Sequence, residues 1–156
     1  MKKNIWRIRN YSLLIAFLVL AFSCSTVPFS DRQQITLLPS SQMMAMSFSQ
    51  YDQFLSENPP VENTSDARLV RQVGNKIANA VKTYMDKNDM AYRLDGFEWE
   101  FNLVDDDLPN AWCMPGGKVV VYKGILPYTQ TEAGLATVMG HEIAHAIARH
   151  GNERMS

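Results

Sequence analysis

The residues best suited to chemistry lie near the end of the chain, in the run His141-Glu142-Ile143-Ala144-His145. On a helix, residues four positions apart lie within roughly 40° of each other and about 6 Å apart along the axis. Both imidazoles can therefore reach one tetrahedral zinc ion (Zn²⁺). The Glu142 carboxylate would lie beside the ion, where it can accept a proton from water and return it to a leaving group. The spacing predicts His141 and His145 as metal ligands and Glu142 as the catalytic residue.

This motif lies in an apolar segment that we expect to form a helix, buried on most sides and running to about Arg149. Thr129 and Glu132 have the spacing of a capping box at its start. Buried histidines without partners would cost free energy, so a bound metal explains them better than a purely structural helix. His150 is nine residues after His141, which on a continuous helix places it on the opposite side and predicts that it is not a ligand.

Two earlier helices are predicted. The first spans residues 40–56, has an uneven apolar face, and ends at Asn58-Pro59-Pro60 because proline cannot continue a helix. The second begins at the cap-type residues Thr64-Ser65-Asp66 and runs through Lys87. Its apolar residues recur at helical spacing and predict one packed face: Leu69, Val73, Ile77, Val81 and Tyr84.

Two strands are predicted between the helices. Residues 97–103 alternate strictly between apolar and polar types, which is typical of a strand with one buried face. Residues 119–122 are rich in β-branched types and follow the tight turn of Pro115-Gly116-Gly117. The acidic residues 105–107 predict a solvated turn, since the segment lacks the glycine and distal glutamate of an EF-hand loop. The order helix, helix, strand, turn, strand, helix predicts an α+β fold.

The first residues are typical of an export signal. A basic stretch is followed by an apolar run from Leu13 to Phe22, shorter than the roughly 20 residues that a membrane span needs. The run ends at Cys24 in a sequence similar to the lipobox of bacterial lipoproteins. We therefore expect a lipoprotein signal peptide over residues 1–23, lipidation of Cys24, and a polar tether over residues 24–40. A plain signal peptide with an incidental cysteine is the alternative.

Charge and cysteine content exclude some functions. Without residues 1–23 the chain has 11 basic and 16 acidic residues, a net charge of −5. We expect no nucleic-acid partner, because nucleic-acid binding uses clustered lysine and arginine. With Cys24 lipidated, Cys113 has no partner for an intrachain disulfide. It is predicted to be a small, half-buried apolar residue rather than a nucleophile or ligand.

Two motifs of the chain resemble peptidase family M48. One is Gly140-His141-Glu142-Ile143-Ala144-His145 with the trailing Ala148-Arg149-His150, and the other is Asn110-Ala111-Trp112-Cys113-Met114-Pro115-Gly116-Gly117. That family includes the CAAX prenyl endopeptidase, the HtpX heat-shock proteases, and the OMA-type and periplasmic quality-control proteases. The resemblance covers roughly residues 35–156. It implies a gluzincin-like fold, a small sheet packed on helices, with the His-Glu-x-x-His run on the active-site helix.

The resemblance also implies a zinc metalloendopeptidase that cleaves unfolded or misassembled envelope proteins. A strand near Asn110 and Ala111 would pair with the substrate backbone. The third zinc ligand would be a glutamate on a helix beyond residue 156, so we expect residues 41–156 to be the N-terminal part of the metallopeptidase domain and inactive alone. Many relatives carry a glutamate where this chain has Gly134.

The lipobox implies a bacterial lipoprotein of the periplasm, anchored in the outer membrane. The alternative is a non-catalytic envelope lipoprotein, either a protease-derived fragment or a chaperone-like binder of unfolded proteins. The third zinc ligand would distinguish an enzyme from such a binder.

Overall fold

The computed structural model describes residues 24–26, 33–35 and 39–151. Cys24–Thr26 (β1) and Gln33–Ile35 (β2) pair as antiparallel strands within the predicted tether. The predicted signal peptide lies outside the described residues, and lipidation of Cys24 stays a prediction. Among the described residues, no helix combines the length and the apolar character needed to cross a bilayer.

A three-stranded sheet lies at the centre of the domain, in the order β3 (Glu100–Val104), β5 (Lys118–Tyr122), β4 (Ala111–Met114). β3 and β5 are parallel, whereas β4 and β5 form an antiparallel hairpin. Gly116 in the hairpin turn has a φ of 89°, a left-handed conformation that favours glycine. A Cβ atom at Gly116 would also collide with the ring of Phe48, so a larger residue in this turn would require that side chain to move.

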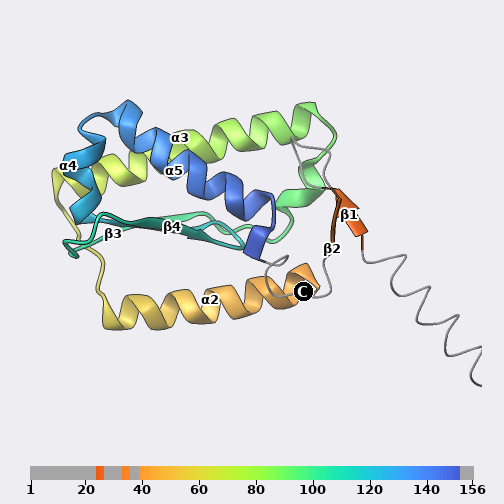
Figure 1. Ribbon diagram of the computed structural model, residues 1–156, viewed down its shortest axis with the longest axis horizontal. Coiled ribbons are helices and arrows are strands. Elements are labelled where there is room, and N and C mark those ends of the chain that lie inside the picture. Colours follow the sequence, from red (N-terminus) through yellow and green to blue (C-terminus); the bar gives the residue numbers. More distant parts are fainter. Residues whose placement is uncertain (1–23, 27–32, 36–38, 152–156) are drawn as a thin grey trace, which may run out of the picture.

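Helices cover both faces of this sheet (Figure 1). α3 (Ser65–Lys87) and α5 (Glu132–Ile147) lie on one face, and α2 (Ser40–Glu57) lies on the other. The connections contain the short helices η1 (Ala91–Leu94), η2 (Lys123–Ile125) and α4 (Leu126–Thr129). This mixture of helices with a small sheet confirms the predicted α+β class.

The larger core lies between the sheet and the pair α3–α5. It contains fully buried side chains from all three elements, among them Val70, Val73, Leu103, Val119, Val121, Leu135 and Met139. Burying an aliphatic side chain of this size stabilises the fold by about 1.5–3 kcal/mol. The predicted cap of α3 is confirmed, because the Thr64 side chain accepts a hydrogen bond from the Ala67 N–H at 3.1 Å. The prediction that Tyr84 packs is wrong: it is 44% exposed, because the last turns of α3 pack on η1, where Met85 is buried instead.

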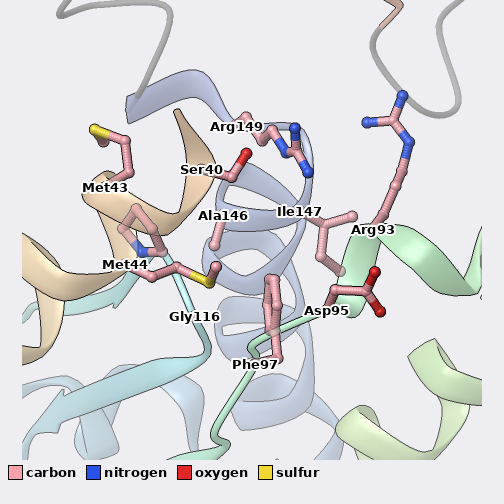
Figure 2. A pocket seen from close by; sticks show the side chains of 11 residues that line it. Ser40, Met43, Met44, Arg93, Asp95, Phe97, Gly116, Ala146, Ile147 and Arg149 are labelled. Carbon is pink, nitrogen blue, oxygen red and sulfur yellow. The ribbon is translucent and has the colours of Figure 1, made fainter. Parts of the chain in front are cut away.

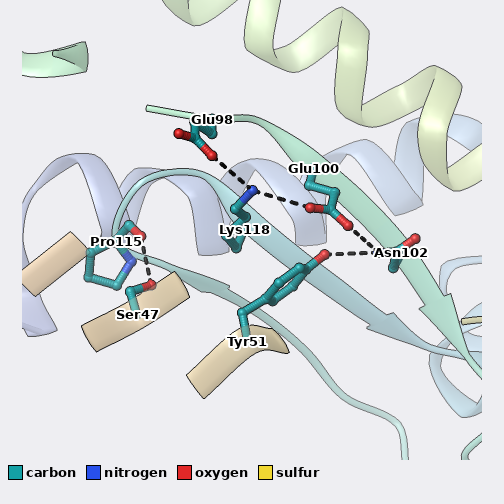
Figure 3. Close-up of polar contacts among 7 residues, drawn as sticks. All are labelled: Ser47, Tyr51, Glu98, Glu100, Asn102, Pro115 and Lys118. Carbon is teal, nitrogen blue, oxygen red and sulfur yellow. Dashed lines mark hydrogen bonds and ion pairs between the residues drawn. The ribbon is translucent and has the colours of Figure 1, made fainter. Parts of the chain in front are cut away.

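α2 is attached to the opposite face by a small aromatic cluster and by hydrogen bonds. Tyr51 is fully buried and meets Trp112 edge-on, with ring centroids 6.2 Å apart. Its hydroxyl accepts a hydrogen bond from Asn102 Nδ2 at 2.9 Å, and Ser47 Oγ donates to the Pro115 carbonyl at 2.7 Å (Figure 3). These bonds satisfy polar groups that α2 removes from water.

Lys118 lies under α2 and is only 9% exposed. Its ammonium is 3.2 Å from a carboxylate oxygen of Glu100 and 3.6 Å from one of Glu98, and it lies 4.9 Å from the ring centroid of Phe48 (Figure 3). A buried charge is tolerated when it is paired in this way. The α2 face of the sheet therefore encloses a polar network, whereas the α3–α5 face is apolar.

The two edges of the sheet differ. Pro60 forms an isolated bridge with Val104, and the Val61 N–H donates to the Leu103 carbonyl at 2.7 Å, so the segment after α2 covers the β3 edge. Among the described residues, no strand pairs with the outer edge of β4. The sheet thus has one edge that can still accept an extended chain.

Two strand predictions need correction. The first strand is Glu100–Val104 rather than 97–103, because residues 97–99 run beside the hairpin turn, where the Glu98 N–H donates to the Gly116 carbonyl at 2.7 Å. β4 was absent from the predicted element order, although the segment from Asn110 was placed near a strand edge. Its four residues are all apolar, so they show no alternation between apolar and polar types.

Candidate metal centre

α5 begins later than predicted. Its N-cap is Thr131, whose side chain accepts a hydrogen bond from the Gly134 N–H at 3.0 Å. The predicted capping box of Thr129 and Glu132 is wrong, because Thr129 belongs to α4 and its hydroxyl donates to the Leu126 carbonyl at 3.1 Å. A Cβ atom at Gly134 would collide with the carbonyl oxygen of Thr129. A larger residue at this position would require α4 to move.

α5 is buried along one face only. Leu135, Met139 and Ile143 face the core, whereas Thr137, His141 and Ala144 are exposed. The prediction of burial on most sides is therefore wrong for the described part of the chain. The residues on the other side are small or polar, such as Thr137 and Ala144, and the described part of the chain does not cover them.

The two histidines of the motif converge on the exposed side of α5. Their Nε2 atoms are 3.0 Å apart, and their rings meet at 84° with centroids 4.5 Å apart. Two nitrogen ligands of a tetrahedral zinc ion, each about 2.0–2.1 Å from it, lie about 3.4 Å apart. The pair therefore fits two zinc ligands after a small adjustment. Within the described residues, no three His, Cys, Asp or Glu side chains are placed to hold one metal ion.

His150 does not lie where the helical spacing placed it. α5 ends at Ile147, and Arg149 adopts a left-handed φ of 59° that turns the chain back. His150 Nδ1 then lies 2.6 Å from His145 Nδ1. The prediction that His150 lies on the opposite side is wrong because it assumed a continuous helix through Arg149. Sequence offers no clear signal for this turn, since a left-handed conformation is uncommon for arginine.

Glu142 borders an open hollow between α5 and β4. The hollow has a volume of about 320 Å³, and its lining includes Trp112, Cys113, Glu142, His145 and His150. Burial, and next the negative charge of Glu142, raise the pKa of the Cys113 thiol to about 12. Cys113 is thus half-buried, as predicted, and its thiol stays neutral at physiological pH, which disfavours a nucleophilic role.

The outer edge of β4 forms one wall of this site. The Tyr122 N–H donates to the Asn110 carbonyl at 3.0 Å. Backbone groups alternate in direction along an antiparallel strand, so those of Ala111 and Cys113 point to the outer edge. Asn110 and Ala111 are the two residues predicted to meet a substrate strand. The backbone groups of Ala111 point to the outer edge of β4, whereas the carbonyl of Asn110 is bonded to β5.

A second, smaller cavity adjoins the hollow at Arg149, between the start of α2 and the end of α5 (Figure 2). Its lining includes Met44, Phe97 and Ile147 together with the two arginines Arg93 and Arg149. Burial, and next the charge of Arg93, lower the pKa of Arg149. Arg149 thus lines this cavity, and the left-handed turn at the same residue brings His150 to His145.

The chain is similar in sequence to several known proteases. It is 49% identical over 59 residues to the mitochondrial metalloendopeptidase OMA1 of Schizosaccharomyces pombe, which covers 38% of this chain and 18% of that protein. It is 26% identical over 159 residues to the human mitochondrial metalloendopeptidase OMA1, covering 98% of this chain and 29% of that protein. The beta-barrel assembly-enhancing protease of Escherichia coli is 27% identical over 155 residues, covering 96% of this chain and 29% of that protein.

The chain spans 12% to 30% of the length of the first curated relatives that it matches. The sequence model of Peptidase family M48 matches residues 70–156, more than half of the chain, and this range contains α5 with its histidine pair and the β4–β5 hairpin. The chain therefore belongs to peptidase family M48.

Proposed function

We propose that this chain carries the catalytic helix of a zinc-dependent metalloendopeptidase, with His141 and His145 as metal ligands. The observation that supports this most strongly is the 3.0 Å approach of the two Nε2 atoms on the exposed side of α5. Glu142 lines the hollow that α5 shares with the open strand edge. The pair of histidines, the carboxylate of Glu142 and the open edge of β4 thus occur together.

Each residue has a distinct role in this proposal. His141 and His145 hold the ion, which when bound acts as a Lewis acid and makes water a nucleophile near neutral pH. Glu142 accepts the proton of the attacking water and passes it to the leaving amine. Because Glu142 is next to His141 in the chain but lines the hollow beside β4, it faces the space in which a scissile bond would lie.

The substrate class follows from the strand edge. An extended polypeptide can add to the outer edge of β4 through the backbone groups of Ala111 and Cys113. Such pairing requires an extended segment whose backbone groups are not already paired, and unfolded segments meet this requirement. Unfolded or misassembled polypeptides are therefore the proposed substrates.

The proposed setting is the bacterial envelope, with an anchor at Cys24. The likeness to the beta-barrel assembly-enhancing protease of Escherichia coli supports a role in envelope protein quality control. The anchor predicts that cells incorporate labelled fatty acid into the protein and that Cys24→Ser abolishes the label. Equal labelling of the variant would remove the lipoprotein assignment and leave the peptidase proposal intact.

Glu142→Gln tests the proposed chemistry, because the amide keeps the size of the side chain and removes the base. In the protein as expressed in its host, we expect chelator-sensitive cleavage of unfolded casein to fall by about 10²–10⁴-fold, with bound zinc retained. Undiminished cleavage would contradict the role of Glu142.

The same assay on these 156 residues tests whether the histidine pair alone supports catalysis. We expect weak zinc binding and no cleavage above background, because catalytic zinc usually has three protein ligands and two side chains of the described part converge. A host-expressed protein that binds unfolded casein without cleaving it would favour the chaperone-like binder.

A further inference from the structure

We infer that His150 is a positioning residue for His145, holding that imidazole in the tautomer and orientation that zinc binding requires. The inference rests on the proposed zinc site of His141 and His145. It adds a residue that lies outside the His-Glu-x-x-His run and acts on the metal only through another side chain.

The two nitrogens of His145 face two different partners. Nε2 lies 3.0 Å from His141 Nε2, and Nδ1 lies 2.6 Å from His150 Nδ1. The His145 and His150 rings are close, with centroids 4.9 Å apart and an interplanar angle of 55°. The three imidazoles therefore form a row with His145 in the middle. His150 meets the nitrogen of His145 that does not face His141, so it is placed behind the ligand pair.

This arrangement fixes the chemistry of the middle ring. A histidine binds a metal through the lone pair of one nitrogen of its neutral ring. If Nε2 of His145 is that nitrogen, its single ring proton is on Nδ1. Nδ1 of His145 then donates a hydrogen bond to Nδ1 of His150, which accepts it through its lone pair. The ring proton of His150 is accordingly on its own Nε2. Ligand histidines commonly donate in this way to a carboxylate, a carbonyl or water, and the partner fixes the tautomer and raises ligand basicity. An imidazole takes that position here.

The contact between His145 and His150 requires a strained backbone conformation at Arg149. Arg149 has a φ of 59°, a left-handed conformation that is strained for a residue with a side chain. Without that turn, His150 would continue along α5 and point away from His145. Packing of the half-buried Arg149 side chain in the cavity beside α2 helps to retain the turn.

The test measures zinc binding rather than cleavage. The 156-residue chain in mild detergent would be titrated with Zn²⁺ against a chromophoric chelator, and with Co²⁺ for its visible absorption bands. We expect His150→Ala to raise the Kd for zinc about 10–100-fold and to shift the cobalt bands. His150→Asn should restore much of the affinity, because its amide oxygen can take the place of Nδ1. His150→Gln should not, because its amide reaches the position of Nε2. Thr137→Ala, an exposed change on the same helix, should leave the affinity unchanged.

Three results would overturn the inference. The first is a His150→Ala protein that binds zinc as tightly as the wild type with the same cobalt spectrum. The second is equal zinc affinity of the Asn and Gln variants, a comparison that still decides the matter if the alanine variant does not fold. The third is a loss from His150→Ala as large as that from His141→Ala with no rescue by Asn, which would make His150 a ligand. An unchanged zinc affinity in His141→Ala would instead refute the proposed zinc site itself, and this inference with it.

Discussion

The two faces of the sheet hold their helices by different means. On the α3–α5 face the contact is apolar, and the histidines of α5 point away from it. On the α2 face, polar groups are buried and paired, among them Lys118 and the hydroxyls of Ser47 and Tyr51. The difference teaches that buried polar side chains in this domain serve to attach α2. The side chains suited to chemistry lie instead on the outer side of α5, which is attached by apolar packing.

The largest expected effect is loss of packing beneath α5. Met139 is fully buried, and Met139→Ala should lower the free energy of unfolding by about 2–5 kcal/mol through lost burial and a cavity. Urea unfolding followed by circular dichroism measures the change. Thr137→Ala, on the exposed side of the same helix, should change stability by less than about 0.5 kcal/mol. Similar losses from both variants would show that α5 is not attached by one apolar face.

Alkaline pH should affect the α2 face through Tyr51. Burial, and next the negative charge of Glu100, raise the pKa of this phenol above its usual value. The unfolded chain releases the proton near pH 10 while the folded protein retains it, so the free energy of unfolding falls as pH rises above about 10. The slope is at most about 1.4 kcal/mol for each pH unit. Urea titrations at pH 8, 10 and 11 should show a steeper decline for the wild type than for Tyr51→Phe, and parallel curves would contradict this prediction.

A smaller effect is expected from the bond between α2 and the hairpin turn. Ser47→Ala leaves the Pro115 carbonyl without its 2.7 Å donor and should cost about 1 kcal/mol. Ser56→Ala is the matched control, since Ser56 is exposed and its hydroxyl donates within α2 to the Gln53 carbonyl. Thermal unfolding of the two variants compares them directly. If the control is as destabilised as Ser47→Ala, the bond to Pro115 does not help to attach α2.

The smallest effect should come from the surface ion pair between α3 and α5. Lys76 Nζ lies 2.6 Å from a carboxylate oxygen of Glu132, but both side chains are largely exposed, by 61% and 47%. Lys76→Ala should cost about 0.2–1 kcal/mol at low salt, and the loss should shrink in about 1 M salt as charges are screened. A salt-independent loss above that range would mean that Lys76 also contributes packing.

Local geometry explains what could be predicted from the sequence. The approach of His141 to His145 depends only on helical spacing, and Thr64 and the Asn58-Pro59-Pro60 run mark helix ends through their own backbone chemistry. These features were predicted correctly, although the ligand roles of the histidines stay predictions.

Tertiary contacts explain what could not be predicted. β4 is a strand because β5 pairs with it, and its four residues have no recognisable pattern of their own. The late start of α5 depends on the close approach of α4 at Gly134. The position of His150 depends on one left-handed arginine. Two of these departures, β4 and the position of His150, lie within the candidate site.

The open edge of β4 has a further consequence for the protein in solution. An edge that accepts any extended backbone also accepts the same edge of a second molecule, and Ala111–Met114 contains no charged residue to oppose that pairing. The short length of the strand limits how many hydrogen bonds such a pair could form. Self-association and substrate binding thus compete for one surface, so the protein is expected to become more prone to aggregation as its concentration rises and less so when extended peptides are present.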